Sequence, residues 1–494
     1  MSSKKILFWI EEPFIDFGIA KYLKKNLETE LYSIIICNNN SKKFFETQKL
    51  VEFKKNWFYR DSILLEKQKI DLDYLTSLEK TLGLHIWEIV AGERFFTSSF
   101  SKYHSFNRNE ILSIIQQEAK FYEMILDEIK PDYLVIRLPD FHNIELLYRI
   151  ARAKGVEVLM NAPSRFGGLT ITDEFDKKIT VNENTIDKEK IKNLNQLQKH
   201  VAEYSKQHGI LVGGFRSSQS KKIKAVLQFL ISDNKKIRNY YQNVGKTRKS
   251  VIYHKILEHF QNFKREKFIN KKFKKNIPKD LPFVYFPLHV EPEQTLLIRA
   301  PHYTDQLCLI TNISKSLPIN YKLFIKEHPA MKFNGWHDIS FYQKILALPN
   351  VEIFHPSLSN EEFIEKSSLV LSIAGTAGLQ AAFYNKPSIV FSDVNYTNLS
   401  SVHHLKNIDE LYDTINIMIN KDVDISELNE YVKKIDESSF KFETMRFSVD
   451  AYNHFGHGGF FADSDVTLEK MTEFLKNNKS DFEILSSEIA KKIS

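Results

Sequence analysis

A lysine and a histidine directly after an apolar run are the first residues in this sequence that could bind a phosphate. The run LFIKEHPAM at 323–331 is typical of a buried strand, and its polar end contains Lys326 and His328. Pro329 restricts the backbone of His328 to an extended conformation, which aims the imidazole out of the strand. Such a pair can hold a phosphate or stabilise a leaving group, although a histidine exposed at a strand end is the plainer interpretation.

An imidazole and two carboxylates follow another apolar run, VYFPLHVEPEQT at 284–295. His289, Glu291 and Glu293 lie within five positions of one another. Their composition suits contacts to sugar hydroxyls or acid–base chemistry. A polar loop that turns at its two prolines explains the same residues.

Small residues follow a third run, in LVLSIAGTAGLQAAFYNKPSIVF at 369–391. We expect a strand to end at Ser372 and a helix to begin near Leu379, so that the turn between them can approach an anion. An ordinary tight turn between a strand and a helix is equally compatible with this pattern. The turn consists of Ala374, Gly375, Thr376, Ala377 and Gly378.

Short apolar runs alternate with helical patterns in two parts of the chain, which indicates parallel sheets covered by helices on both faces. The fold class that we predict is α/β, with two Rossmann-like domains that face a central cleft. Ligands of such sheets bind beyond the carboxyl ends of the strands, where all three motifs fall. The expected strands are residues 5–10, 31–37, 132–137, 156–160, 283–286, 321–326, 351–354, 369–372 and 388–391.

The length of 494 residues is too great for one hydrophobic core. We divide the chain by its patterns into an N-terminal α/β domain at 1–215 and a basic helical connector at 216–280. A C-terminal α/β domain at 281–440 and a helical tail at 441–494 follow.

Composition excludes several classes of protein. Hydrophobic residues make up 43% and charged residues 27%, the balance of a folded rather than a disordered chain. The two cysteines are too few for a disulfide scaffold or a cysteine-rich zinc module. No signal peptide or membrane-spanning run is apparent. We expect a cytoplasmic protein, either free or peripheral on the inner face of the cell membrane.

Positive charge is concentrated in residues 221–280, which contain 18 Lys or Arg and 4 Asp or Glu. A solvated helical linker explains such a stretch as readily as a binding surface. Among binding partners we favour an anionic membrane over nucleic acid, because no aromatic signature of an RNA-binding strand accompanies the charge. The predicted membrane contacts are Lys271, Lys272, Lys274 and Lys275.

The order of the three motifs resembles the capsule polysaccharide biosynthesis family, which includes the glycosyltransferases that add Kdo to lipid carriers. FPLHVEPEQT, KEHP, PNVEIFHP and GTAGLQAAFYNKPSIVF carry the resemblance over residues 281–400. Residues 82–96 and 137–143 resemble the family more loosely. The resemblance implies a GT-B fold, a nucleotide-sugar donor on the second domain and a glycan or lipid-linked glycan acceptor.

Carried onto this sequence, the resemblance places His328 and Pro329 beside the donor phosphate and residues 372–378 along the nucleotide pocket. The family usually has Glu where this chain has Gln380, which changes the contacts available to a ribose. The predicted nucleotide-sugar-binding residues are His289, Glu293, Lys326, His328, Pro329, Ser372, Gly375, Thr376, Ala377, Gly378 and Gln380.

A catalytic base must then come from a strand-end loop of the first domain. Asp140 is the first choice, and Asp16 and Glu12 are rivals, although each carboxylate could equally be a helix cap. We expect no cofactor and no metal held by the protein. Two other functions remain open: a polyol-phosphate transferase of the teichoic-acid type, and a protein that binds sugar nucleotides or polysaccharide without catalysis.

Overall fold

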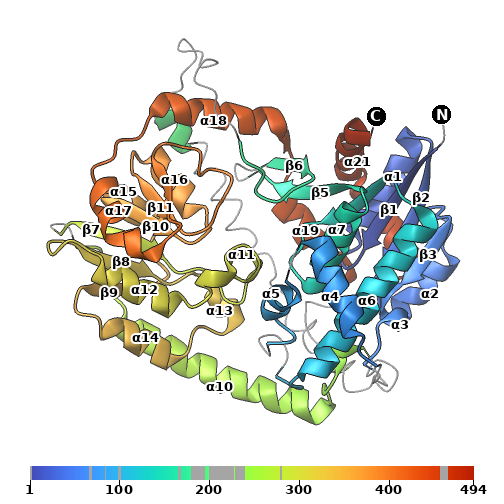
Figure 1. Ribbon diagram of the computed structural model, residues 1–494, viewed down its shortest axis with the longest axis horizontal. Helices are drawn as coiled ribbons and strands as arrows, with labels where there is room; N and C mark the ends of the chain where they lie inside the picture. Colours follow the sequence, from blue (N-terminus) through green and yellow to red (C-terminus); the bar gives the residue numbers. More distant parts are fainter. Residues whose placement is uncertain are drawn as a thin grey trace. The chain divides into compact units, whose positions relative to one another are not determined.

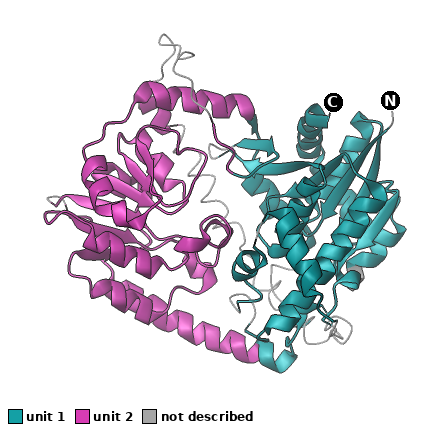
Figure 2. Cartoon of the chain, viewed as in Figure 1, with its two compact units in different colours: residues 1–175, 206–251, 439–494 teal, residues 176–205, 252–438 magenta. Residues whose placement is uncertain are grey.

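The computed structural model shows two compact units, which are coloured separately in Figure 2. Unit 1 consists of residues 1–175, 206–251 and 439–494, and unit 2 consists of residues 176–205 and 252–438. The structure describes residues 3–65, 69–83, 85–97, 102–164, 168–179, 195–199, 227, 240–278, 281–456 and 466–493.

Unit 1 is built on a seven-stranded sheet with the order β13-β6-β5-β4-β1-β2-β3 (Figure 1). The strands from β5 to β3 in this order pair in parallel, and β6 and β13 are antiparallel additions at one edge. The strands are β1 (Lys4–Ile10), β2 (Thr29–Ile35), β3 (Lys55–Phe58), β4 (Tyr133–Arg137), β5 (Glu157–Pro163), β6 (Gly168–Thr172) and β13 (Phe440–Lys441).

Both faces of this sheet are buried, as the continuous apolar run of β1 predicts. Leu7 and Trp9 belong to the core that includes side chains of α4, α6 and α7, whereas Ile6 and Phe8 belong to the core under α1 and the C-terminal helices. The helices of unit 1 are α1 (Ile15–Asn26), α2 (Asn39–Thr47), α3 (Tyr59–Ser62), α4 (Leu72–Leu82), α5 (Ile86–Ala91), α6 (Arg108–Ile129), α7 (His142–Ala153), α19 (Thr444–Phe455), α20 (Leu468–Asn477) and α21 (Lys479–Ile493).

The C-terminal helices pack on unit 1 and do not form the separate tail predicted for residues 441–494. Gly18 of α1 faces Phe482 of α21, and a Cβ atom at Gly18 would lie 2.1 Å from that ring. Phe474 and Phe482 are buried to 1% exposure or less in the core that α1 covers. The sequence prediction separated these helices from unit 1 because most of their residues are polar and only a narrow face of each helix is apolar.

Unit 2 is built on a six-stranded sheet with the order β12-β11-β10-β7-β8-β9, in which every pair is parallel. Its strands are β7 (Phe283–Pro287), β8 (Lys322–Lys326), β9 (Val351–Phe354), β10 (Leu369–Ser372), β11 (Ser388–Val390) and β12 (Val402–His404). Its helices are α11 (Gln294–Leu297), α12 (Gln306–Lys315), α13 (Met331–Asn334), α14 (Ile339–Leu346), α15 (Asn360–Lys366), α16 (Ala377–Phe383), α17 (Leu411–Met418) and α18 (Ile425–Ser438).

A long helix, α10 (Arg248–Lys272), runs across the boundary between the two units at residue 251. After it ends, the backbone N–H of Lys274 donates to the carbonyl of Ile353 in β9, so this part of the predicted connector joins the sheet of unit 2. Residues 216–226 and 228–239 of the predicted connector lie outside the described residues. No helix in the described part is long and apolar enough to cross a membrane.

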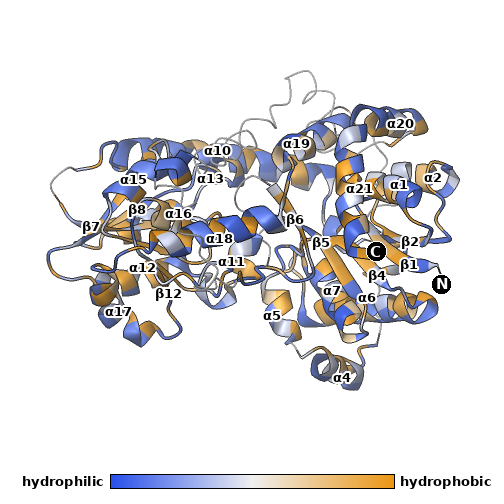
Figure 3. Cartoon of the chain, turned by 90° about the horizontal axis from the view of Figure 1, so that it is seen from above, coloured by the Kyte–Doolittle hydropathy of each residue, from blue (hydrophilic) through white to orange (hydrophobic). Residues whose placement is uncertain are grey.

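The predicted α/β class with two Rossmann-like domains is confirmed, because unit 2 has a parallel sheet and unit 1 a mainly parallel sheet, each between layers of helices. Figure 3, coloured by hydropathy, shows the same layers. The inner strands of unit 1 are largely hydrophobic, while its helices have both hydrophobic and hydrophilic residues. Every strand predicted from the sequence is present, with ends that match the prediction or differ from it by at most three residues. The cleft between the domains stays a prediction.

Candidate nucleotide-sugar site

Three neighbouring strands of unit 2 bring the sequence motifs to one edge of its sheet. β7 lies between β10 and β8, and all three run in the same direction. Ser372 is the last residue of β10, and the loops after β7 and β8 contain His289 and His328. Residues from motifs far apart in the sequence therefore meet at the edge where open α/β sheets bind ligands.

His289 joins the loop after β7 to the turn after β10. Its Nε2 atom lies 3.5 Å from the hydroxyl of Ser372 and accepts from the backbone N–H of Ala374 at 3.4 Å. The Ser372 hydroxyl in turn accepts from the N–H of Gly375 at 3.1 Å. A Cβ atom at Gly375 would lie 3.0 Å from the His289 ring, so a side chain there would crowd this contact.

The His289 imidazole is neutral at physiological pH. Burial, with a smaller effect of the nearby charge of His328, lowers the pKa of His289 to about 3. Since Nε2 accepts a hydrogen bond, the proton of the neutral ring belongs on Nδ1. His289 is therefore suited to holding the 372–375 turn in place rather than to donating a proton.

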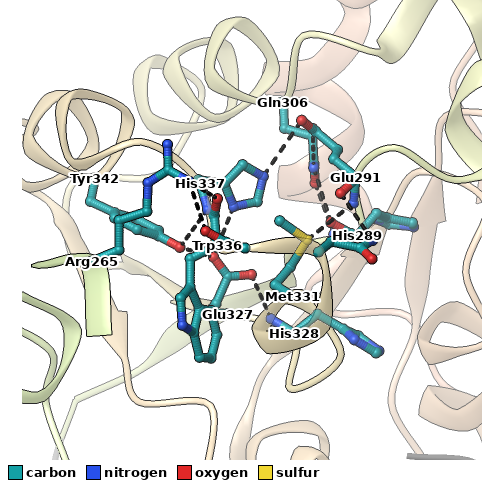
Figure 4. A network of polar contacts seen from close by, with 12 residues as sticks. Arg265, His289, Glu291, Gln306, Glu327, His328, Met331, Trp336, His337 and Tyr342 are labelled. Carbon is teal, nitrogen blue, oxygen red and sulfur yellow. Dashed lines mark hydrogen bonds and ion pairs between the residues drawn. The ribbon is translucent and has the colours of Figure 1, made fainter. Parts of the chain in front are cut away.

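Gln306, at the start of α12, fixes the backbone of the same loop. Its Oε1 accepts from the N–H of His289 at 2.8 Å, and its Nε2 donates to the His289 carbonyl at 3.2 Å. The Nε2 group also donates to the carboxylate of Glu291 at 2.5 Å. Figure 4 shows these side chains converging around the loop after β7. Glu291, rather than the exposed Glu293, is the carboxylate that the structure adds to this network.

Glu327 is the buried centre of a second set of contacts, which hold the loop after β8. Its side chain is 0% exposed, and it accepts from Tyr342 at 2.5 Å and from the backbone N–H of His328 at 2.7 Å. His337 lies between Glu327, at 2.9 Å, and Glu291, at 3.5 Å. Burial alone would lower the pKa of His337, but hydrogen bonds to both carboxylates raise it to about 9. A protonated His337 thus links the loops after β7 and β8.

Lys326 has a different environment from the one expected of a donor-binding cation. Its side chain is 5% exposed, and its ammonium group donates to the carbonyl of Leu358 at 3.1 Å. Burial lowers the pKa of Lys326 to about 8, against the opposing effect of Glu327. The lysine ties together the loops after β8 and β9, and a contact with a donor stays a prediction. His328 is half-buried and Pro329 is exposed, so these residues are more accessible to a ligand than Lys326.

The glycine-rich turn is shaped by packing within unit 2. The helix that follows it, α16, has only seven residues, and Thr376 makes no side-chain capping bond to it. A Cβ atom at Gly378 would lie 2.9 Å from the hydroxyl of Tyr396. Ala377 is buried and Gln380 is half-buried on α16. The turn is thus closely packed against Tyr396. That it binds an anion stays a prediction.

In unit 1, Asp140 lies in the loop after β4 and is engaged by arginines. Its carboxylate pairs with Arg137 at 2.5 Å, and its carbonyl accepts from Arg94. Arg137 also pairs with Glu11, in the loop after β1. Tyr452 of α19 lies close enough for the charges of Arg137 and Asp140 to affect its pKa, although burial raises that pKa most.

The two rival bases differ in exposure. Asp16 is 7% exposed in the first turn of α1, and burial raises its pKa to about 7. Glu12 is half-buried in the loop after β1 and contributes to the electrostatic surroundings of Tyr452. Asp140 and Glu12 thus both lie near Tyr452 at the carboxyl edge of this sheet, whereas Asp16 is buried in the first turn of α1.

A fully buried network joins three segments of unit 1: the loop before α6, α6 itself and the start of α7. His142, at the start of α7, pairs with Glu93 and with Glu118, the latter at 3.0 Å, and all three side chains are 0% exposed. Burial alone would lower the pKa of His142, but the two carboxylates raise it to about 10. The sequence analysis did not predict this network, although Glu93 and His142 fall within the segments 82–96 and 137–143 that it singled out.

The sequence analysis also did not predict that Glu327, His337 and Tyr342 form one hydrogen-bonded group. Glu327 is the glutamate of the KEHP motif. Its place at a strand end, next to His328, was the sequence feature that could have indicated it. The described part of the chain contains no group of three or more His, Cys, Asp or Glu side chains that could hold a metal ion.

Comparison with known proteins gives one family match. Residues 177–399 match the family model described as capsule polysaccharide biosynthesis protein. Comparison with curated protein sequences finds no match.

Solved structures give matches of low identity and low TM-score. One match is the Thermosulfurimonas dismutans KpsC, a beta Kdo 2,7 transferase, which is 13% identical to this chain with a TM-score of 0.31. The match covers 70% of this chain and 87% of the KpsC chain. The S. aureus MnaA–UDP structure is 13% identical with a TM-score of 0.28, covering 92% and 96%. A Methanocaldococcus jannaschii UDP-GlcNAc 2-epimerase in complex with UDP-GlcNAc and UDP is 13% identical with a TM-score of 0.28, covering 88% and 99%.

Proposed function

We propose that this chain, whose residues 177–399 match the model of the capsule polysaccharide biosynthesis family, is a glycosyltransferase. It moves a sugar from a nucleotide-sugar donor to a surface-polysaccharide or lipid-linked glycan acceptor. Unit 2 contains most of the matched segment and binds the donor, and a strand-end carboxylate of unit 1 acts on the acceptor.

The contact of His289 with Ser372, beside the loop of His328, is the observation that supports this proposal most. It links two motifs of the family-matched segment at the carboxyl edge of a parallel sheet. The neutral His289 fixes the turn, so the more accessible His328 is left to meet the negative charge of the donor phosphates. A positioned imidazole can donate a hydrogen bond to a phosphate oxygen and offset charge as the leaving group departs.

Asp140 is the proposed base toward the acceptor hydroxyl. Its carboxylate is 26% exposed, so it can be reached, and its ion pair with Arg137 fixes its orientation. A base of this kind takes the acceptor proton as the new glycosidic bond forms and the bond to the nucleotide phosphate breaks. We expect neither step to need a metal, because His328 would offset the charge of the leaving group.

A thermal-shift screen of the full chain against CMP, UDP, GDP and CDP conjugates identifies the donor, because a ligand that binds only the folded state raises its melting temperature. His328→Ala should weaken binding of the active donor by roughly tenfold or more, the loss of one hydrogen bond to a charged group. His403→Ala, an exposed histidine on the edge strand β12, serves as the matched control.

Product analysis with the identified donor, with and without EDTA, then tests the reaction. A glycosidic product without phosphorus supports the proposal. A new phosphodiester would identify a polyol-phosphate transferase instead, and binding without turnover on glycan acceptors would identify a binding protein. Loss of transfer on adding EDTA would contradict the metal-independent mechanism.

A further inference from the structure

The helix α10 exposes an unusual number of large apolar side chains. Six of them are between 39% and 65% exposed in the part of the chain that the structure describes. At 100° per residue they fall within an arc of about 140° on the helix surface. They are Ile252, Tyr253, Ile256, Leu257, Phe260 and Phe263.

A different face of the same helix binds it to unit 2. Ile269 is 1% exposed, Phe268 stacks on Tyr342, and Arg265 donates to the carbonyl of Gly335 at 2.8 Å. These contacts hold the C-terminal half of α10 and leave the six apolar side chains facing outward. The exposed apolar face is therefore not part of the hydrophobic core of unit 2.

Positive charge accompanies this apolar face. Residues 248–272 contain eight Lys or Arg and two Asp or Glu. Four exposed lysines, Lys249, Lys264, Lys267 and Lys271, fall within the same arc and flank the apolar residues at both ends of the helix. A second protein would need a matching acidic and apolar surface, whereas an anionic bilayer offers both without specific shape.

We propose that this face of α10 lies on the surface of an anionic phospholipid bilayer, with its apolar side chains among the lipid headgroups and acyl chains. Amphipathic helices with aromatic and aliphatic residues on one face and lysines beside them bind membranes in this way. Tyr253, Phe260 and Phe263 supply the aromatic rings that favour the interfacial region. The lysines supply attraction that fades with added salt.

This assignment shifts the predicted contacts along the helix. Lys271 keeps its place on the proposed face. Lys274 instead pairs with Glu352 at 2.7 Å, which ties it to β9. Lys272 and Lys275 are exposed, but Lys272 points away from the arc and Lys275 lies beyond the end of α10. The proposal therefore rests on the apolar residues, on Lys271 and on three lysines that the sequence prediction did not select.

Vesicle sedimentation of the full chain tests the proposal. The protein should sediment with vesicles of phosphatidylcholine and phosphatidylglycerol at low salt, less at high salt, and not with phosphatidylcholine alone. Ile256→Ser with Phe260→Ser should lower the partition coefficient by at least about tenfold, because two apolar side chains no longer enter the bilayer. Lys264→Glu with Lys267→Glu should lower it comparably at low salt.

Tyr412→Ser with Ile417→Ser is the matched control, because it removes 54% and 68% exposed side chains from α17, a helix without lysine or arginine. Circular dichroism and melting temperature verify that each variant folds. The proposal is overturned if the wild-type chain ignores anionic vesicles, or if the Ile256 and Phe260 variant binds them as well as the control. It is equally overturned if those substitutions only convert a dimer to a monomer in sedimentation velocity, which would make the face a contact between two copies of the chain.

Discussion

The Nε2 atom of His289 lies 3.5 Å from the hydroxyl of Ser372, although 83 positions separate the two residues in the sequence. The contact exists because β7 and β10 are neighbours in a parallel sheet, so their carboxyl ends lie side by side. The contact joins the loop after β7 to the glycine-rich turn after β10, so that the two segments form one continuous surface. The donor site that we propose depends on that surface.

Ser372→Ala should weaken donor binding because the hydroxyl organises the turn. Its loss leaves the N–H of Gly375 without its acceptor and costs about 1–3 kcal/mol of stability. Ser367→Ala is the control, since Ser367 is also buried and hydrogen-bonded but precedes β10 at the opposite edge of the sheet. Donor titrations should show weakened affinity for the Ser372 variant alone. Equal affinity in both variants would remove Ser372 from the site.

His337→Gln should cost more stability at pH 6 than at pH 10. The folded-state pKa of His337 is raised to about 9, above its ordinary value of 6.5. Its stabilising effect is therefore complete below pH 6.5 and is lost as the pH rises through 9, at most roughly 3 kcal/mol. Urea unfolding of the variant and wild type at the two pH values measures the difference. His403→Gln, an exposed control, should cost the same at both, and an equal loss for His337 would contradict a charged imidazole between Glu291 and Glu327.

Asp140→Asn should lower the rate of transfer by about 10²–10⁴-fold, the usual contribution of a general base. Donor affinity should be unchanged, because Asp140 belongs to unit 1. Asp73→Asn, an exposed aspartate in the first turn of α4, is the matched control for rate. If the Asp140 variant keeps the wild-type rate, the base is another residue, and Glu12→Gln is the next variant to measure.

Gly18→Ala should destabilise unit 1 by about 1–3 kcal/mol, because the added methyl group meets the ring of Phe482. Phe482→Ala alone leaves a cavity and costs about 3–5 kcal/mol. In the double variant the added methyl group enters that cavity. The double variant should therefore lose less stability than the two single variants lose together. Additive losses in chemical denaturation would contradict the packing of α21 on α1.

Sequence patterns predicted the strands and the three strand-end motifs because both depend on local features. The runs of β9 and β10 are short, apolar and bounded by polar residues, and their predicted limits match the structure. Chain patterns do not reveal which strands become neighbours. The pairing of His289 with Ser372, and of His142 with Glu93, follows from strand order and long-range packing, so neither could be read from spacing.

Hydrogen–deuterium exchange of the full chain, with and without the donor found by the thermal-shift screen, tests the central claim most directly. We predict slower exchange in peptides that cover residues 287–293, 326–331 and 372–378, because the donor binds at the carboxyl edge of the unit 2 sheet. Protection confined to unit 1, or exchange in these three loops that the donor leaves unchanged, would contradict the donor site.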